Sequence, residues 1–215
     1  MLKQPNWHDL DRKLVAILRG IRPEETAEIV TILLAVGFEA IEIPLNSPEP
    51  FASIKIAAEV AKSKRPEGCF IGAGTVLTVD EVVRVQASGG NVIVSPNVNA
   101  EVISKSRELG LFSMPGVLTP TEAHSAIATG ANVLKFFPAS ILGADGIKAI
   151  KAILPTSQEI CAVGGVGPAS FADYLKVGVH GFGIGSNLYQ PGLTAWDVEA
   201  RAKDIFAAFD KASES

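Results

Sequence analysis

Short apolar segments alternate along the chain with longer segments in which apolar residues recur at helical spacing. Short runs rich in β-branched and aromatic residues predict buried strands, and the longer amphipathic segments predict helices. Eight strands are expected, near residues 14–19, 38–43, 69–73, 91–94, 111–114, 132–137, 160–163 and 181–185. A helix-compatible segment follows each of them, and residues 194–212 form the last.

A glycine marks the junction between a helical segment and the next strand. Examples are Val36-Gly37-Phe38, Thr129-Gly130-Ala131 and Val177-Gly178-Val179. Glycine is favoured where a helix ends in the left-handed conformation. Gly89 and Gly110 are 21 residues apart, and Gly110 and Gly130 are 20 apart. A repeat this short suits one strand and one helix per unit.

The repeat predicts an α/β fold, a (β/α)8 TIM barrel in a single domain over residues 1–215. Helix starts such as Pro23-Glu24-Glu25 and Thr119-Pro120-Thr121-Glu122 support it, because proline and acidic residues are favoured in the first turn of a helix. Residues 1–12 are expected to form an arm or short helix that closes the bottom of the barrel. A doubly wound open sheet is the alternative fold.

Composition excludes several classes of protein. The chain is 47% hydrophobic with a formal net charge of −4 and a pI near 5.4, and its basic residues form no stripe, so nucleic acid is not expected as a partner. No apolar run reaches the roughly 18 residues needed to span a membrane. Cys69 and Cys161 lie in apolar stretches and predict buried thiols in a reducing compartment. With no apolar signal segment at the N-terminus, a cytoplasmic location is expected.

Metal chemistry is not indicated by the sequence. The three histidines, His8, His124 and His180, have no ligand-like spacing, and neither cysteine has a CxxC partner. No dinucleotide or Walker fingerprint is present either. We therefore expect no metal and no cofactor.

Lys135 is the most informative residue, because it interrupts the apolar run Asn132–Pro138. Lysine is rarely buried, and burial favours its neutral amine, which can attack a carbonyl carbon to form a Schiff base. Arg19 and Glu42 also lie at the ends of apolar strands, where a barrel gathers its chemistry. A structural ion pair would explain any one of the three charges, but less readily all three together.

These three charges fit one type of reaction. Arg19 can hold a substrate carboxylate with a bidentate fork, and Glu42 can carry protons during the formation of a Schiff base and the cleavage of a carbon–carbon bond. Thr75, at the end of the third expected strand, can add a hydroxyl contact. A threonine bonded to the backbone at a strand end is an equally good explanation of Thr75.

The last two strands end in glycine-rich segments. Val163-Gly164-Gly165-Val166 and Gly183-Ile184-Gly185-Ser186 follow consecutive strands. Glycine lets backbone N–H groups approach an anion closely, and the loops after strands 7 and 8 of this fold are a frequent phosphate site. Tight turns would explain either segment alone, whereas the pair together favours phosphate binding.

With these residues assembled, the chain resembles the bacterial aldolases that cleave 2-keto-3-deoxy-6-phosphosugar acids. The resemblance runs from about Leu14 to Gly192. The motifs that carry it are Ile17-Leu18-Arg19-Gly20, residues 39–48 (EAIEIPLNSP), residues 71–76 (IGAGTV), Ser95-Pro96-Asn97, residues 134–139 (LKFFPA) and Val163-Gly164-Gly165-Val166.

The resemblance implies a metal-free class I aldolase, a carbon–carbon lyase that acts as a homotrimer on a small phosphorylated keto-deoxy sugar acid. It implies that Lys135 forms the Schiff base with pyruvate and that Glu42 is the general acid and base. The implied substrate-binding residues are Arg19 and Thr75 for the pyruvoyl carboxylate, Pro96 and Phe137 for the shape of the pocket, and Gly164, Gly165, Gly185 and Ser186 for the phosphate.

Two branches of the family differ in the sugar acid that they cleave. Ala162-Val163-Gly164-Gly165 and Leu45-Asn46-Ser47-Pro48 resemble the galactonate-derived branch, whereas Phe136-Phe137-Pro138-Ala139 looks more like the gluconate-derived branch. A valine at position 163 in place of a threonine would remove a hydrogen-bonding group, which changes discrimination strongly. We expect the galactonate series, with the gluconate series as the alternative and a non-catalytic phosphosugar-binding barrel as a third hypothesis.

Overall fold

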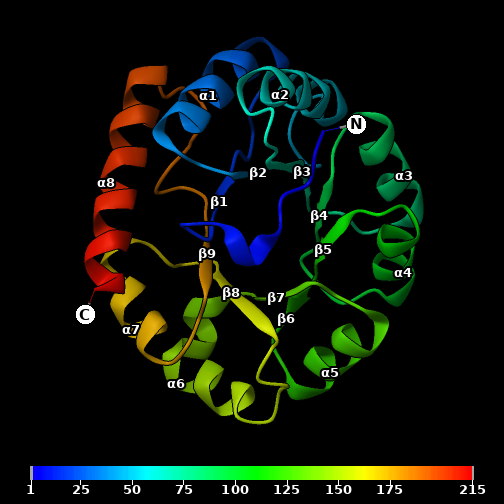
Figure 1. Cartoon of the computed structure of the whole chain (residues 1–215), viewed down its shortest axis with the longest axis vertical. Helices are drawn as coiled ribbons and strands as arrows, with labels where there is room; N and C mark the ends of the chain where they lie inside the picture. The colour runs from blue at the N-terminus through cyan, green and yellow to red at the C-terminus, as the bar shows by residue number, and fades with distance from the viewer. Residues whose placement is uncertain (1, 215) are drawn as a thin grey trace.

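A computed structural model of the chain describes residues 2–214, so residues 1 and 215 of the predicted domain lie outside it. Parallel strands form a barrel, and helices form a ring around it (Figure 1). The strands are β1 (Leu14–Ile17), β2 (Ala40–Pro44), β3 (Phe70–Gly74), β4 (Val92–Val94), β5 (Phe112–Met114), β6 (Gly116–Val117), β7 (Val133–Phe136), β8 (Glu159–Val163) and β9 (Gly181–Ile184). The α-helices are α1 (Pro23–Val36), α2 (Pro50–Lys64), α3 (Val79–Ala87), α4 (Ala100–Glu108), α5 (Pro120–Thr129), α6 (Ala139–Lys151), α7 (Phe171–Lys176) and α8 (Ala195–Ser213).

The order of the strands is β5-β4-β3-β2-β1-β9-β8-β7-β6, and every neighbouring pair is parallel. β5 and β6 are the two halves of one strand interrupted at Pro115, which lacks an N–H for the ladder. The N–H of Asn132 donates to the carbonyl of Ser113 (3.0 Å), and β6 pairs with β7, which closes the ring. The predicted barrel is therefore confirmed, and the open sheet is wrong.

The helix ends follow the signals in the sequence. Thr119 accepts a hydrogen bond from the N–H of Glu122, and the Glu122 carboxylate returns the contact, which forms a capping box at the start of α5. Gly37 and Gly130 end α1 and α5 with φ of 117° and 96°. The glycine junctions therefore stop the helices as predicted, and each strand–helix unit is set by local sequence.

The apolar side chains form two layers. One layer lies between the outer face of the barrel and the helices. The other fills the lower interior of the barrel, where Val15, Phe70 and Phe112 meet Trp7. Trp7 belongs to a short 3-10 helix, η1 (Trp7–Asp9), and the N-terminal segment carries it across the barrel axis (Figure 1). This apolar layer does not fill the upper interior, at the carboxyl ends of the strands.

Within residues 2–214, no helix combines the length and the apolar character needed to cross a membrane.

Candidate active site

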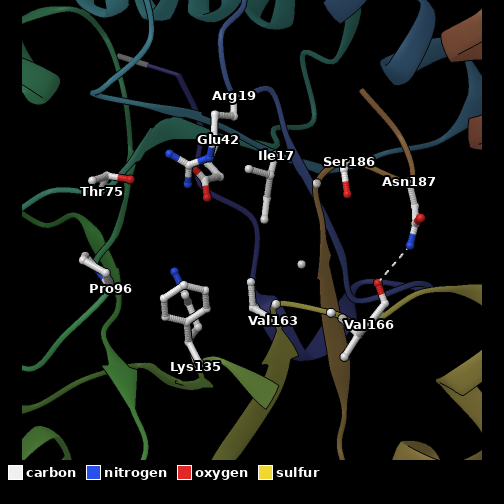
Figure 2. A pocket seen from close by; sticks show the side chains of 15 residues that line it. Ile17, Arg19, Glu42, Thr75, Pro96, Lys135, Val163, Val166, Ser186 and Asn187 are labelled. Carbon is white, nitrogen blue, oxygen red and sulfur yellow. Dashed lines mark hydrogen bonds between the residues drawn. The ribbon is translucent and has the colours of Figure 1, made fainter. Parts of the chain in front are cut away.

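A cavity of about 530 Å³ opens at the carboxyl ends of the strands. All eleven residues that the sequence singled out line it, although they come from seven different strands and the loops after them (Figure 2). They are Arg19, Glu42, Thr75, Pro96, Lys135, Phe137, Val163, Gly164, Gly165, Gly185 and Ser186. The cavity is also lined by Ile17, Val166, Gly183 and Asn187, which the sequence analysis did not select.

The alternation of side chains along a strand puts Glu42 and Lys135 inside the barrel. Side chains two residues apart point to the same face of a strand. Ala40 and Val133, two residues earlier on β2 and β7, belong to the apolar layer in the lower interior. Glu42 and Lys135 therefore sit one layer above it and point into the cavity toward each other (Figure 2).

Lys135 is almost completely buried, with 6% of its surface exposed. Burial lowers the pKa of its amine, and the positive charge of Arg19 lowers it further, while the Glu42 carboxylate opposes both effects. The Lys135 Nζ lies 4.7 Å from the centroid of the Phe137 ring. The neutral, nucleophilic form of the Lys135 amine is therefore more favoured in the site than it would be in bulk water.

Glu42 is the buried carboxyl group of the site, with 2% of its surface exposed. Burial raises its pKa to about 7, although the charges of Lys135 and Arg19 pull in the other direction. Its Oε2 atom has no hydrogen-bond partner within residues 2–214. A carboxyl group that titrates near neutral pH and keeps one oxygen unengaged is suited to proton transfer.

Two glycines on inward positions make room for these side chains. A Cβ atom at Gly74 would overlap the Glu42 carboxylate, and a Cβ atom at Gly183 would lie 2.8 Å from a methyl group of Val163. Either clash would displace a side chain that lines the cavity. The hollow upper barrel therefore depends on glycine as much as on the side chains that line it.

The sequence placed Arg19 inside an apolar strand, and this was wrong in detail. β1 ends at Ile17, so Arg19 lies two residues beyond it on an exposed loop. Its guanidinium still turns back beside Glu42 (Figure 2). Thr75 follows β3 directly and has a left-handed φ of 59°, which is unusual for a β-branched residue. Strained backbone of this kind is retained mainly at functional sites.

The opposite side of the cavity presents backbone N–H groups. Gly164 and Gly165 have φ of 90° and 72°, which turns the chain sharply after β8. The N–H groups of Gly165, Gly185 and Ser186 donate to no acceptor in the described part of the chain. Unengaged N–H groups on two neighbouring loops form a suitable binding site for an anion.

Asn187 is a site residue that the sequence analysis missed. Its Nδ2 donates to the carbonyl of Val166 (3.2 Å) and so ties the loop after β9 to the loop after β8 (Figure 2). The signal was a third small polar position directly after Gly185 and Ser186. The bond fixes the distance between the two halves of the anion site.

The cavity contains a buried amine and a carboxyl group with a pKa of about 7. A guanidinium lies on one side of them and backbone N–H donors lie on the other. Such a set can hold a molecule with an anionic group at each end and a carbonyl carbon between them. No group of three histidine, cysteine or acidic side chains within residues 2–214 is arranged to hold a metal ion.

Known proteins share this architecture. The model of the family "KDPG and KHG aldolase" matches residues 10–202. A protein of Rhizobium meliloti (strain 1021) named "Probable 2-dehydro-3-deoxy-6-phosphogalactonate aldolase" is 54% identical over 94% of this chain and 93% of its own length. The Escherichia coli (strain K12) "2-dehydro-3-deoxy-6-phosphogalactonate aldolase" is 43% identical over 93% of both chains.

The fold agrees with these sequence matches. A solved structure described as "Native KDPGal structure" superposes with a TM-score of 0.90 at 38% identity and covers 95% of this chain and 98% of that one. The matches extend through the strands that carry the cavity. The chain belongs to the KDPG and KHG aldolase family.

Proposed function

We propose that the protein is a class I aldolase that cleaves 2-dehydro-3-deoxy-6-phospho-D-galactonate to pyruvate and D-glyceraldehyde 3-phosphate. The observation that carries the proposal is Lys135, a lysine buried inside the barrel with a lowered pKa and a carboxyl group facing it. Membership of the aldolase family and the names of both curated relatives support the reaction and the galactonate series.

In the proposed mechanism, the neutral amine of Lys135 attacks the C2 carbonyl carbon of the substrate. Glu42 transfers protons as the carbinolamine loses water to give an iminium. Glu42 then removes the proton of the C4 hydroxyl, the C3–C4 bond breaks, and its electron pair passes into the iminium to form an enamine. Glyceraldehyde 3-phosphate leaves, C3 is protonated, and hydrolysis of the imine releases pyruvate and the amine.

The two ends of the substrate match the two ends of the cavity. Arg19 and Thr75 are proposed to bind the carboxylate next to C2, on the side where Lys135 lies. Gly164, Gly165, Gly185 and Ser186 are proposed to bind the phosphate through backbone N–H groups. Pro96 and Phe137 shape the wall between them. This places C2 at the amine and keeps the phosphate away from the reacting bond.

Val163 is proposed to select the configuration at C4. Its side chain is buried at the end of β8 and lines the cavity. A methyl group there offers no hydrogen bond to a C4 hydroxyl, so the epimer whose hydroxyl finds a donor or acceptor elsewhere is favoured. The gluconate series is the alternative substrate.

Borohydride reduction in the presence of pyruvate tests the Schiff base. We expect loss of activity and a covalent pyruvate-derived mass increase on the peptide that contains Lys135. Lys135→Met should neither be labelled nor turn over, and Lys148, on the surface helix α6, should stay unmodified in both proteins. Full activity with no label on Lys135 would overturn the mechanism. Binding of a phosphosugar without any trapping would instead favour the non-catalytic barrel.

The choice of substrate is tested by kcat/KM on the two C4 epimers. We expect the galactonate-derived epimer to be preferred, and Val163→Thr to shift the preference toward the gluconate-derived one. A parent enzyme that prefers the gluconate-derived epimer would assign the protein to the other branch, with the Schiff-base mechanism unchanged.

We also propose that the chain is one domain, forms a homotrimer and is cytoplasmic. The family resemblance supports the trimer, and Ile141, an isoleucine that is 76% exposed in the single chain, is available for a subunit contact. Light scattering after gel filtration should give three times the 22.5 kDa mass of one chain. Cell fractionation tests the location, which the two buried free thiols, Cys69 and Cys161, support.

A further inference from the structure

Arg19 reaches the cavity from a loop, and nothing in that loop holds its side chain. β1 ends at Ile17, and Arg19 is an exposed residue of the loop that follows it. An arginine side chain carries about 2 kcal/mol of rotamer entropy. A guanidinium that must meet a carboxylate at a fixed place therefore needs a partner that limits its motion.

That partner comes from the loop after β2. The Nη1 of Arg19 donates to the side-chain oxygen of Asn46 at 2.5 Å. The N–H of the next residue, Gly20, donates to the hydroxyl oxygen of Ser47 at 2.9 Å. The side chains of two consecutive residues in the loop after β2 thus hold two consecutive residues in the loop after β1. Arg19 is held by its side chain and Gly20 by its backbone N–H.

The β2 loop is itself rigid enough to act as a support. The N–H of Ser47 donates to the carbonyl of Pro44 (2.9 Å), which closes a turn around Asn46, and the N–H of Leu45 donates to the carbonyl of Gly74 (2.8 Å) on β3. Ser47 is buried at 7% exposure. Asn46 is therefore presented from a turn fixed to the strand that leads into Thr75, the other proposed carboxylate contact.

An amide is better suited to this contact than a carboxylate. The side-chain carbonyl of Asn46 is neutral, so it engages one hydrogen of the guanidinium and adds no negative charge beside it. Within residues 2–214, Arg19 has no other hydrogen bond and no ion pair. Its remaining donors stay available for an anionic ligand, whereas an aspartate at position 46 would pair with the charge and compete with that ligand.

We propose that Asn46 is a positioning residue that orients Arg19 for the carboxylate of the 2-oxo acid and leaves its charge free. The proposal rests on the proposed aldolase function. Asn46 does not line the cavity, so it acts through Arg19 and not by touching the substrate.

The test compares Asn46→Leu, which keeps the branched shape and removes the acceptor, with Asn46→Asp, which keeps the acceptor and adds a charge. The readout is the pyruvate concentration that gives half-maximal borohydride trapping at Lys135. We expect about a tenfold increase for Asn46→Leu, since hydrogen bonds to charged groups contribute about 1.5 kcal/mol or more. Trapping at saturating pyruvate should be nearly unchanged. Asn46→Asp should also weaken pyruvate binding, although Arg19 stays in place.

A double-mutant cycle separates positioning from general damage to the loop. With Arg19→Met as the background, Asn46→Leu should cause no further rise in the half-maximal pyruvate concentration. An equal rise in both backgrounds, or no rise in the single variant, would overturn the role of Asn46. Absence of trapping in the parent enzyme would instead reject the proposed function, so the two failures are distinguishable.

Discussion

At the scale of single residues, burial in the site disfavours the charged forms of two ionisable groups, Lys135 and Glu42. Burial lowers the pKa of Lys135 and raises that of Glu42, so both groups shift toward their neutral forms. Their mutual attraction opposes this, and the balance leaves Glu42 with a pKa of about 7. Near neutral pH Glu42 can therefore both accept and donate a proton, which a reaction with several proton transfers requires.

The pKa of Glu42 predicts how cleavage depends on pH. Attack on C2 needs the neutral amine of Lys135, removal of the C4 hydroxyl proton needs ionised Glu42, and both forms increase as the pH rises. We expect kcat/KM to rise through about pH 7. Glu42→Gln should lower kcat/KM by about 10²-fold or more. Because the Glu42 charge raises the pKa of Lys135, the remaining inflection should move to lower pH.

The profiles of the parent and of Glu42→Gln are measured on the same substrate over the range in which both remain folded. An unchanged inflection near pH 7 with activity within a few-fold of the parent would remove Glu42 from the proton transfers.

Single residues also show where reading the sequence succeeds. Lys135 could be selected because a lysine in an apolar strand stands out against its neighbours. The left-handed backbone of Thr75 and the contact between Arg19 and Asn46 could not be predicted. Both depend on how two loops meet in space, and neither changes the local pattern of apolar and polar residues.

At the scale of elements, strand and helix positions followed from local sequence, but strand continuity did not. The fifth predicted strand runs on past Pro115 into β6, and the carbonyl of Pro115 accepts the N–H of Lys135 (3.0 Å). The proline therefore breaks the ladder on its own strand while it helps to fix the backbone of the lysine. Similarly, α6 contains a kink at Gly143 (φ 69°, ψ 169°) that its helical pattern did not indicate.

Helix α8 supports the anion site through Arg201. The Nη1 of Arg201 donates to the carbonyl of Ser186 (3.3 Å), and the Nε2 of Gln190 donates to the same oxygen (3.1 Å). In a trans peptide the carbonyl and the following N–H point in opposite directions. Holding the Ser186 carbonyl toward α8 therefore fixes the orientation of the loop that carries Gly185 and Ser186.

This contact predicts a defect limited to phosphorylated substrates. In the condensation direction, Arg201→Gln should raise KM for glyceraldehyde 3-phosphate about fivefold, the effect of losing about 1 kcal/mol. KM for unphosphorylated glyceraldehyde should be unchanged. Lys203→Gln, an exposed cation on the same helix that pairs with Glu199, is the matched control and should affect neither. Equal changes in KM for both aldehydes would mean that Arg201 stabilises the fold in general and does not contribute specifically to phosphate binding.

At the scale of the whole molecule, the barrel separates stability from chemistry along its axis. The lower interior is apolar and closed by Trp7, whereas the upper interior holds the ionisable groups and the glycines that make room for them. The glycine repeat was enough to predict this overall shape. The sequence could not show that the N-terminal arm inserts an aromatic ring, because the contacts of Trp7 involve strands far away in the chain.

This separation predicts that a substitution at the lower end of the barrel can lower the stability of the fold without lowering catalytic activity. Trp7 is 3% exposed, and its ring lies 5.7 Å from that of Phe70 and 5.5 Å from that of Phe112. Trp7→Ala should lower the free energy of unfolding by about 3–5 kcal/mol, as for other large aromatic deletions in cores. The kcat per folded molecule should stay close to that of the parent. Urea unfolding, with active sites counted by borohydride trapping, measures both.

Trp196, which is 75% exposed on α8, offers a control of the same residue type. Trp196→Ala should change the free energy of unfolding by no more than about 0.5 kcal/mol, as is usual for exposed positions. Trp7→Phe should fall between the two, because it keeps an aromatic ring and removes an indole N–H that has no partner within residues 2–214. If Trp7→Ala lowered kcat per trapped site while stability was kept, the lower end would take part in catalysis, and the division of the barrel into two ends would be wrong.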